Sequence, residues 1–451
     1  MGRVAFLATL LGLVAALGWI SSRHFIVRTL TDERLTYSRA ILLPAIERFP
    51  ASPRLQKRVI ESYLNPNDSE PDDNEPDSRE LEVDYGKAAE HAMQAVRLSP
   101  HNGRLWYWLA QAQEGQGLTA EAEQSLGQAA RLAPSDSQVN WGLANVLVRA
   151  GKVDESVEYF RRSVSLNANL YPQAFDTLWQ AGGRKLELLR EICGTKPAAQ
   201  LSLAQYLVEQ RQYGECATLF ESLVQTTDAA TLAAIPQTND VLNQLLAAEQ
   251  PLMARQIWQQ LWMKLQPLNA AKDATNSGLL WDGGFEYDAR PALPQFTWIL
   301  HDSDFARVGY DDRVYHSGRA AEGAGRQSLK LLFTGRDTTV LSGEVRQRLA
   351  LEPGRRYRFE AAVKGDQLVY TEGPRLAIML SNGVVLAQSA PLPDGTWDWQ
   401  TFTFDFVTPT ASGPSGQVMF FDIVRTLKLA YDPPVKGALW FDDLKLVAVE
   451  N

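Results

Sequence analysis

The chain has 451 residues, enough for two or three domains with sizeable hydrophobic cores. Its formal charge of -9, from 44 basic and 53 acidic residues, and its lack of any basic run argue against nucleic acid as a partner. Two cysteines are too few for a disulfide-dense scaffold or a four-cysteine zinc site, and Cys193 and Cys216 are expected to be buried free thiols rather than a bridge.

The first feature of the chain is an uncharged stretch from Val4 to Ile20, bounded by Arg3 and Arg23. At about 1.5 Å per residue it just spans a hydrocarbon core of about 30 Å, so residues 1–30 are predicted to hold a membrane segment. No clear small-x-small cleavage site follows, which favours a retained anchor over a cleaved signal peptide. Arginines on the two flanks argue for opposite orientations, so the sequence leaves the orientation open.

Residues 31–266 are predicted to be helical, because apolar residues recur at helical spacing along most of this stretch. Residues 65–80 interrupt the pattern with seven carboxylates and three prolines against one arginine. Such a composition buries too little apolar surface to fold alone. We expect a solvated acidic loop inserted between helical hairpins.

A 34-residue pattern recurs between Asp84 and Ala168. Small residues recur at two of its offsets, with a bulkier apolar group between them in the later units: Ala88, Ala122 and Ser156, then Ala95, Ala129 and Ser163, with Ala92, Leu126 and Phe160 between. Gly117 and Gly151 occupy equivalent positions in successive units, where a first helix has to end. Each unit is predicted to be a helical hairpin that stacks on its neighbours, because one hairpin cannot bury its apolar face alone.

The unit around Trp106 resembles the tetratricopeptide repeat. The repeat pattern W-x2-L-G-x2-Y…A-x3-F…P is matched by Trp106, Leu109, Ala110, Ala122, Leu126 and Pro134. Ala110 replaces the glycine and Gln113 replaces the tyrosine of that pattern. After Ala168 the pattern weakens, although the stretch 203–220 keeps the offsets of the stretch 143–160 and predicts a degenerate hairpin after an insertion.

The resemblance implies a concave groove that binds a protein partner through the first helix of each hairpin. The matching positions are Arg104, Tyr107, Gln111, Glu114, Gln138, Trp141 and Asn145. Tyr107 and Trp141 are out of phase with the apolar stripe and are expected to be exposed anchors. The alternative is that both pack on a neighbouring helix or on the β domain.

Residues 267–277 are small and polar and predict a linker; after it, residues 278–451 change from helical to alternating periodicity. Alternation is clearest in the stretches 328–333, 356–363, 376–380, 402–406 and 444–448. Turn pairs such as Asn382-Gly383 separate these stretches. The fold class predicted for the whole chain is therefore α + β and multidomain: a membrane helix, an α-solenoid and an antiparallel β-sandwich of the jelly-roll kind.

The last segment resembles the carbohydrate-binding modules of the family 4/9 type. The residues that carry the resemblance are the stretch Trp281 to Glu286, the strand entry Leu351 to Phe359 and the closing Trp440 to Leu444. The resemblance implies a structural calcium where the first and last strands meet, with Glu286, Asp442 and Asp443 as the matching ligands. The alternative is that the two aspartates are turn or edge polar groups.

The resemblance also implies a glycan platform. If the phenylalanines of 402–406 point into the core, the opposite parity places Trp397, Trp399, Thr401, Thr403 and Asp405 on one outer face. Apolar C–H faces of a pyranose stack on aromatic rings while placed polar groups bind its hydroxyls. A bulge, or a core position for either tryptophan, would dissolve this row.

No motif for catalysis is present: the five histidines are scattered and none of the hydrolase, P-loop or dinucleotide fingerprints occurs. The function expected is a non-enzymatic, membrane-anchored adaptor that binds a protein partner and a polysaccharide, with its bulk periplasmic or otherwise extracytoplasmic. Envelope polysaccharide assembly or export would suit such a protein. The alternatives are a pure protein-interaction scaffold with a non-binding β domain and, less favoured, a glycan-modifying enzyme.

Overall fold

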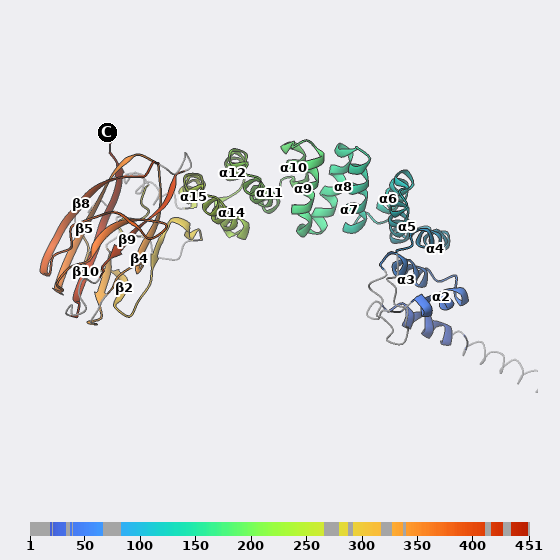
Figure 1. The fold of residues 1–451 in the computed structure, drawn as a ribbon, viewed down its shortest axis with the longest axis horizontal. Helices are drawn as coiled ribbons and strands as arrows, with labels where there is room; N and C mark the ends of the chain where they lie inside the picture. Colours follow the sequence, from blue (N-terminus) through green and yellow to red (C-terminus); the bar gives the residue numbers. More distant parts are fainter. Residues whose placement is uncertain are drawn as a thin grey trace, which may run out of the picture. The chain divides into compact units, whose positions relative to one another are not determined.

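The computed structural model describes residues 19, 21–32, 37, 39–65, 83–265, 279–286, 292–316, 327–336, 340–410, 416–426 and 434–449. The chain forms two compact units, Met1–Gly194 and Thr195–Asn451 (Figure 1). The predicted membrane segment, acidic loop and linker fall outside the described residues, apart from Trp19 and Asn65. Within the described part of the chain, no helix is both long and apolar enough to span a bilayer.

The first unit consists of antiparallel helices. Their bounds are α2 Arg39–Arg48, α3 Pro53–Leu64, α4 Tyr85–Leu98, α5 Gly103–Gly115, α6 Thr119–Leu132, α7 Ser137–Arg149, α8 Val153–Leu166, the short η2 Ala168–Leu170, α9 Tyr171–Ala181 and α10 Leu186–Cys193. The bounds of α5 and α6 recur in α7 and α8 at the predicted repeat spacing, which confirms the period. The small residues at the repeated offsets are fully buried where hairpins meet.

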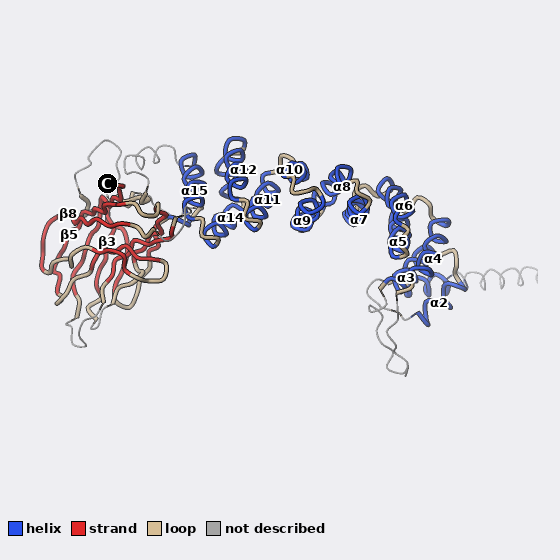
Figure 2. The backbone as a smooth tube through the Cα atoms, turned by 45° about the horizontal axis from the view of Figure 1, so that its top comes forward, coloured by secondary structure: helices blue, strands red, loops and turns tan. Residues whose placement is uncertain are grey.

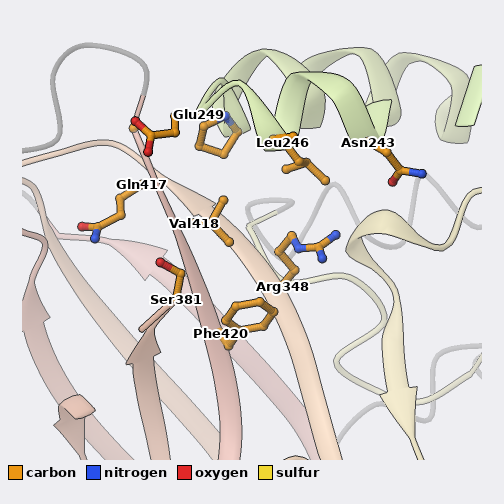
Figure 3. A pocket seen from close by; sticks show the side chains of 11 residues that line it. Asn243, Leu246, Glu249, Arg348, Ser381, Gln417, Val418 and Phe420 are labelled. Atoms are coloured by element: carbon orange, nitrogen blue, oxygen red, sulfur yellow. The ribbon is translucent and has the colours of Figure 1, made fainter. Parts of the chain in front are cut away.

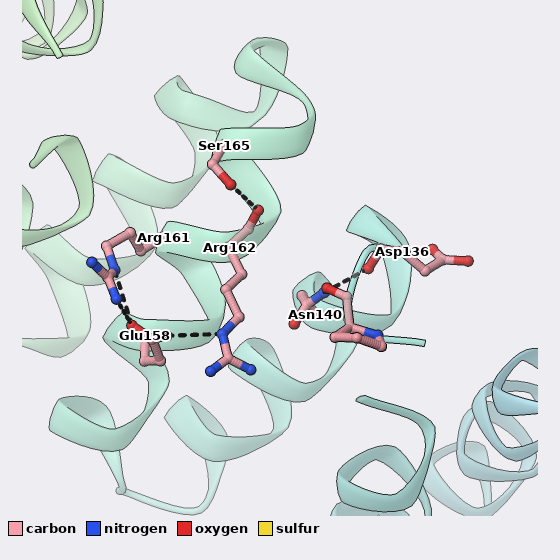
Figure 4. Close-up of polar contacts among 7 residues, drawn as sticks. Asp136, Asn140, Glu158, Arg161, Arg162 and Ser165 are labelled. Atoms are coloured by element: carbon pink, nitrogen blue, oxygen red, sulfur yellow. Dashed lines mark hydrogen bonds and ion pairs between the residues drawn. The ribbon is translucent and has the colours of Figure 1, made fainter. Parts of the chain in front are cut away.

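A side-chain hydrogen bond recurs where first helices begin. Trp106 Nε1 donates to the Pro100 carbonyl at 2.8 Å, and Asn140 Nδ2, at the equivalent position of the next unit, donates to the Pro134 carbonyl at 2.9 Å. Gln56 donates in the same way to the carbonyl six residues before it, at the start of α3. Figure 4 shows this start of α7 beside the Glu158–Arg161–Arg162 contacts of α8. Different side chains thus satisfy the same turn carbonyl.

The turn that ends first helices also recurs. Gly117 and Gly151 have φ of 78° and 76°, and in each case the next N–H donates to the carbonyl five residues before it. The same bond closes α11 and α14, but there Arg211 and Glu249 occupy the left-handed position, each with φ of 57°. Side chains other than glycine are disfavoured at such positive φ, so these hairpins lack the sequence signal of the earlier ones.

In the part of the second unit that the structure describes, the helices α11 to α15 precede a pair of sheets (Figure 2). The helices are α11 Pro197–Glu209, α12 Tyr213–Thr226, α13 Ala229–Ala234, α14 Pro236–Ala247 and α15 Pro251–Leu265, followed by the short η4 Pro294–Phe296. The strands are β1 Trp298–Leu300, β2 Ala306–Asp311, β3 Ser328–Phe333, β4 Val345–Leu351, β5 Arg356–Val369, β6 Arg375–Leu380, β7 Val385–Gln388, β8 Gly395–Val407, β9 Gln417–Val424 and β10 Lys436–Ala448. Helices α11 and α12 have the same lengths and the same intervening turn length as α7 and α8, as the shared offsets predicted.

The strands form two antiparallel five-stranded sheets, β1-β4-β9-β6-β7 and β2-β3-β10-β5-β8. This confirms the predicted two-layer strand domain. The alternating residues predicted to face the core do so: Leu329, Leu331 and Phe359 are fully buried, and Phe359 stacks on Phe421 of the opposite sheet.

Helix α15 is joined to the sandwich by large side chains. Trp258 is 3% exposed, donates from Nε1 to the Leu293 carbonyl at 2.9 Å, and stacks on Trp262. Trp262 in turn meets Trp281 edge-on, with ring centroids 5.3 Å apart. Arg255 is buried against β4, donating to the Ala350 carbonyl at 3.0 Å, and burial lowers the pKa of this guanidinium to about 10. The last helical hairpin and the strands therefore share one core.

Candidate binding sites

The first candidate site lies along three first helices, α3, α5 and α7, which contact one another in that order. A pocket of about 230 Å³, here called the repeat groove, is lined by Lys57, Glu61, Arg104, Tyr107, Trp108, Asp136, Gln138 and Val139. Three of the predicted partner-binding residues, Arg104, Tyr107 and Gln138, belong to it. Lys57 and Glu61 were missed because α3 precedes the repeat that the sequence shows. Trp108 and Asp136 lie within that repeat but at offsets that the resemblance did not assign to the groove.

Tyr107 and Trp141 are half-buried rather than exposed, which corrects the prediction. The ring of Tyr107 lies against Gly142 of α7 and meets Trp108 edge-on at 5.5 Å. Burial raises the pKa of the Tyr107 hydroxyl. Trp141 packs edge-on against the buried Phe160 of its own hairpin. Both rings therefore pack on a neighbouring helix, which is the alternative that the sequence left open.

The other predicted partner-binding residues make polar contacts within the repeats. Arg104 pairs with Asp136 at 2.9 Å, and Glu114 pairs with Arg149. Asn145 donates to the Trp141 carbonyl at 2.8 Å, and Gln111 is half-buried on α5. Of these four residues only Arg104 lines the repeat groove, whose lining holds two basic and two acidic side chains beside Tyr107 and Trp108.

The second candidate surface is the outer face of β8, where a bulge splits the predicted row. Val363 pairs with Gln400 and Gly365 with Trp397, so two residues of β8, Asp398 and Trp399, stand opposite Lys364 alone. Trp397 consequently turns to the inner side, against Gly365 and Phe402, and its place in the row is wrong. Trp399, Thr401, Thr403 and Asp405 keep the outer side.

Neighbouring side chains already contact both ends of that outer row. Asp405 accepts two hydrogen bonds from Arg358, at 2.8 and 3.1 Å. Trp399 is half-buried against the His316 ring, with centroids 5.4 Å apart. Trp399 is thus the one aromatic ring among the four, and a flat row with one ring offers a sugar little stacking surface.

The third candidate feature is the group of carboxylates predicted to bind calcium. A Cβ added at Gly284 would lie 3.8 Å from Glu286 Oε1 and 3.9 Å from Asp442 Oδ1, so the two ends of the strand domain meet here as predicted. Burial, with the charges of Asp443 and Glu286, raises the pKa of Asp442 to about 7. His316 donates its backbone N–H to Asp442 and contacts Asp443 through Nδ1 at 2.7 Å.

A cation would relieve the mutual repulsion of these carboxylates, so the donor set suits a hard metal ion in its chemistry. Among the residues that the structure describes, however, no three His, Cys, Asp or Glu side chains are grouped as a metal site.

The fourth candidate site is a groove between the end of α14 and the outer face of the first sheet, here called the α14 groove (Figure 3). Its volume is about 650 Å³, within the range of about 300–1,000 Å³ usual for small-ligand sites. Its lining residues are Asn243, Leu246, Ala247, Glu249, Pro251, Arg348, Ser381, Gly416, Gln417, Val418 and Phe420. Sequence reasoning missed it entirely, because its two walls lie far apart in the chain.

Comparison with known families identifies the helical repeats. Residues 82–139 and residues 115–174 match two family models described as tetratricopeptide repeat. Hairpins from α4 to α8 are therefore tetratricopeptide repeats, as the sequence predicted. No curated protein sequence matches the chain.

Solved structures resemble parts of the chain at low identity. A CBM4 structure is 17% identical over 32% of this chain and 78% of its own, with a TM-score of 0.22. The crystal structure of MamA is 15% identical over 34% of this chain and 81% of its own, with a TM-score of 0.28. A Stig cyclase from Fischerella sp. TAU is 16% identical over 38% of this chain and 96% of its own, with a TM-score of 0.26. Identities of this order concern the fold alone.

Proposed function

We propose that this protein is a non-enzymatic adaptor whose tetratricopeptide repeats bind a protein partner and whose strand-containing unit binds a glycan. The observation that carries the proposal is the presence of two separate grooves, one in each compact unit, each lined by both polar and apolar side chains. Repeat arrays present extended concave surfaces to their partners. A pocket of mixed lining on a strand domain suits a small polar ligand such as a sugar.

Tyr107 is the residue on which binding of a protein partner can be tested. The test selects peptides from a display library with the full chain and measures their affinity by fluorescence anisotropy. Tyr107→Ala should weaken selected peptides about tenfold or more, because aromatic anchors carry much of such binding. Leu118→Ala, which alters an exposed side chain at the hairpin turn outside the repeat groove, is the matched control. Equal affinities for the two variants would move the partner site elsewhere.

The glycan arm is assigned to the α14 groove in preference to the outer face of β8. The α14 groove has depth, an apolar wall and polar groups from both α14 and the sheet, whereas Trp399 and Asp405 of the β8 face already contact neighbouring side chains. Calorimetry of the full chain against a glycan panel, with Phe420→Ala and Trp399→Ala compared, tests the assignment. Loss of binding in Phe420→Ala alone supports the α14 groove, and loss in Trp399→Ala alone returns the site to β8. No binding to any glycan leaves a protein-interaction scaffold only.

The uncharged stretch from Val4 to Ile20 supports a membrane anchor. We place the repeats and the strands on the extracytoplasmic side, because an envelope polysaccharide would be bound there. An anchored adaptor with these two arms would suit assembly or export of an envelope polysaccharide. Protease digestion of cells whose outer membrane has been permeabilised and whose inner membrane is intact tests the location. The repeats should be cleaved under these conditions. Protection under those conditions would place the bulk in the cytoplasm.

A structural calcium held by Glu286, Asp442 and Asp443 is a further part of the proposal, supported by the convergence of these carboxylates. Calcium should raise the thermal unfolding temperature of the wild type and leave Asp442→Asn unchanged. An unfolding temperature that is the same in calcium and in chelator would refute the site. The non-enzymatic assignment is checked by a reducing-sugar assay on the glycans that bind.

A further inference from the structure

The polar end of the α14 groove is built as a connected set of contacts. Gln295, 5% exposed, donates from Nε2 to Asn239 at 2.9 Å and to the Asn243 Oδ1 atom at 3.3 Å. Its backbone carbonyl accepts a hydrogen bond from Arg348 Nη1 at 3.0 Å. One buried glutamine therefore links α14 to β4, and the amide oxygen of Asn243 already accepts one hydrogen bond. The NH₂ group of Asn243 and the remaining N–H groups of Arg348 are left as donors at this end.

The charges of the two neighbouring arginines of β4 are compensated differently. Arg346 makes two hydrogen bonds, of 3.0 and 2.7 Å, to one carboxylate oxygen of the fully buried Asp422. Arg348 pairs with no carboxylate among the residues that the structure describes, and it is half-buried. Burial lowers the pKa of the Arg348 guanidinium, because a charged group loses hydration there. The groove therefore contains one fixed, uncompensated guanidinium.

Arg348 also lies beside the ring of Phe420, which the Arg346 guanidinium approaches at 5.1 Å from the centroid. The guanidinium carbon of Arg348 lies over Phe420 at 5.7 Å from the ring centroid, a distance at which the cation and the ring attract. Figure 3 shows Asn243 and Leu246 descending from α14 toward the strands that carry Arg348, Val418 and Phe420. It also shows Glu249 at the end of the groove away from Asn243. An anionic group is therefore favoured at the Arg348 end and disfavoured at the Glu249 end.

We propose that the α14 groove binds an acidic sugar, a uronate unit of a polysaccharide. Its carboxylate pairs with the Arg348 guanidinium, and its C–H groups lie against Leu246, Val418 and Phe420. The planar fork of an arginine matches a carboxylate, and such charge-assisted pairs are roughly twice as strong as neutral hydrogen bonds. Asn243 donates to a hydroxyl or ring oxygen beside the carboxylate. This inference rests on the proposed glycan function and names the class of glycan.

The test is isothermal titration calorimetry of the full chain with short oligosaccharides of galacturonate, glucuronate and mannuronate and with their carboxyl-reduced counterparts. Reduction replaces each carboxylate by a hydroxymethyl group and leaves the ring intact. The wild type should bind at least one acidic oligosaccharide about tenfold more tightly than its reduced form. Because this arm uses the wild type, it stands even if an Arg348 variant folds poorly.

Variants then locate the charge. Arg348→Gln should weaken binding of the acidic sugar about tenfold and leave the reduced sugar unaffected, and Arg348→Lys should fall between. Arg356→Gln, which removes the same charge from an exposed position on β5, is the matched control and should bind as the wild type does. An equal loss in Arg356→Gln would indicate a general charge effect and overturn the proposal.

The remaining outcomes separate this inference from the proposed function. If the reduced sugars, or neutral glycans, bind as tightly as the acidic ones and Phe420→Ala weakens them, the acidic specificity is wrong and the glycan function stands. If no acidic, reduced or neutral glycan binds, the glycan function itself fails.

Discussion

The hairpins α5 to α8 and the joint between α15 and the sandwich bury their contacts with opposite kinds of side chain. In the hairpins, the repeated contact positions are small: Ala122, Ala129, Ser156 and Ser163 are all 0% exposed. At the joint, Trp258 and Trp262 stack on each other and meet large rings from the strand domain. Small side chains make the contacts in the first case, and large rings make them in the second.

The difference follows from the range of the contacts. Each hairpin touches only its neighbours in the chain, so the same small residues can recur at the same offsets. At the joint, α15 contacts Trp281, Leu293 and Phe296 as well as β4, and these partners belong to no repeat. Local packing is therefore periodic and distributed over many positions, whereas the joint concentrates its burial in a few large side chains.

The largest expected effect is at the joint. Trp258→Ala should lower the free energy of unfolding of the second unit by about 3–5 kcal/mol, because it removes a buried ring and leaves the Leu293 carbonyl without its donor. Hydrogen exchange measures it: protection of residues 197–265 and of the strands should fall, and protection of residues 85–166 should stay. Trp258→Phe is the control and should recover most of the loss. A parallel loss in the repeats would show that the two units unfold together.

The next effect concerns pH and the strand domain alone. The pKa of Asp442 is raised to about 7 from a usual value of 3.8, so the folded protein keeps a proton that the unfolded chain releases between these values. The free energy of unfolding should therefore fall as pH rises through this window, by on the order of 2–4 kcal/mol without calcium. Asp442→Asn should flatten the dependence, which urea unfolding in chelator would measure.

The same pH dependence of stability should be measured in the presence of calcium. If the carboxylates bind the ion, they bind it deprotonated, and the loss of stability toward neutral pH should disappear. An unchanged slope in Asp442→Asn would show that another group carries the pH dependence.

Two glycines of the hairpin α5/α6 test whether small residues are needed for close packing. A Cβ on Gly103 would lie 2.8 Å from the Ala133 Cβ and 3.0 Å from the Ala129 carbonyl, so Gly103→Ala should cost about 1–3 kcal/mol. A Cβ on Gly127 meets nothing within 4 Å, so Gly127→Ala in the interior of α6 should stabilise by about 0.5–1 kcal/mol. Urea unfolding of the first unit compares them. Equal effects would mean that helix propensity, and not close approach, explains the small residues.

The smallest effect is expected on the surface of α8. Glu158 contacts Arg161 and Arg162 one turn away, and its side chain is 39% exposed. Glu158→Gln should cost less than about 0.5 kcal/mol, and salt should abolish the difference, because such exposed pairs are weak and screened. A loss of more than about 1 kcal/mol in the free energy of unfolding that persists in salt would mean that Glu158 contributes to packing as well as to ion pairing.

The candidate sites differ in how much of each could be predicted from the sequence. Arg104, Tyr107 and Gln138 of the repeat groove follow from the repeat offsets, because first helices present the same positions in every hairpin. The convergence of Glu286 and Asp442 follows from the stretch Trp281 to Glu286 and from the closing motif Trp440 to Leu444. Trp397 was misplaced because one extra residue on β8 reverses the parity beyond it, and nothing in the alternation of β8 shows where that residue falls.

The sequence by itself determined the periods: the repeat length of the hairpins, the alternation of the strands, and the change from one to the other after Leu265. These periods are local properties, because the apolar residues on the buried face of a helix or strand recur with the period of that element. Only the tertiary structure decided that α15 shares a core with the sandwich and that Arg348, Phe420 and Asn243 line one groove. Those contacts join elements with unrelated periods, so no spacing along the chain records them.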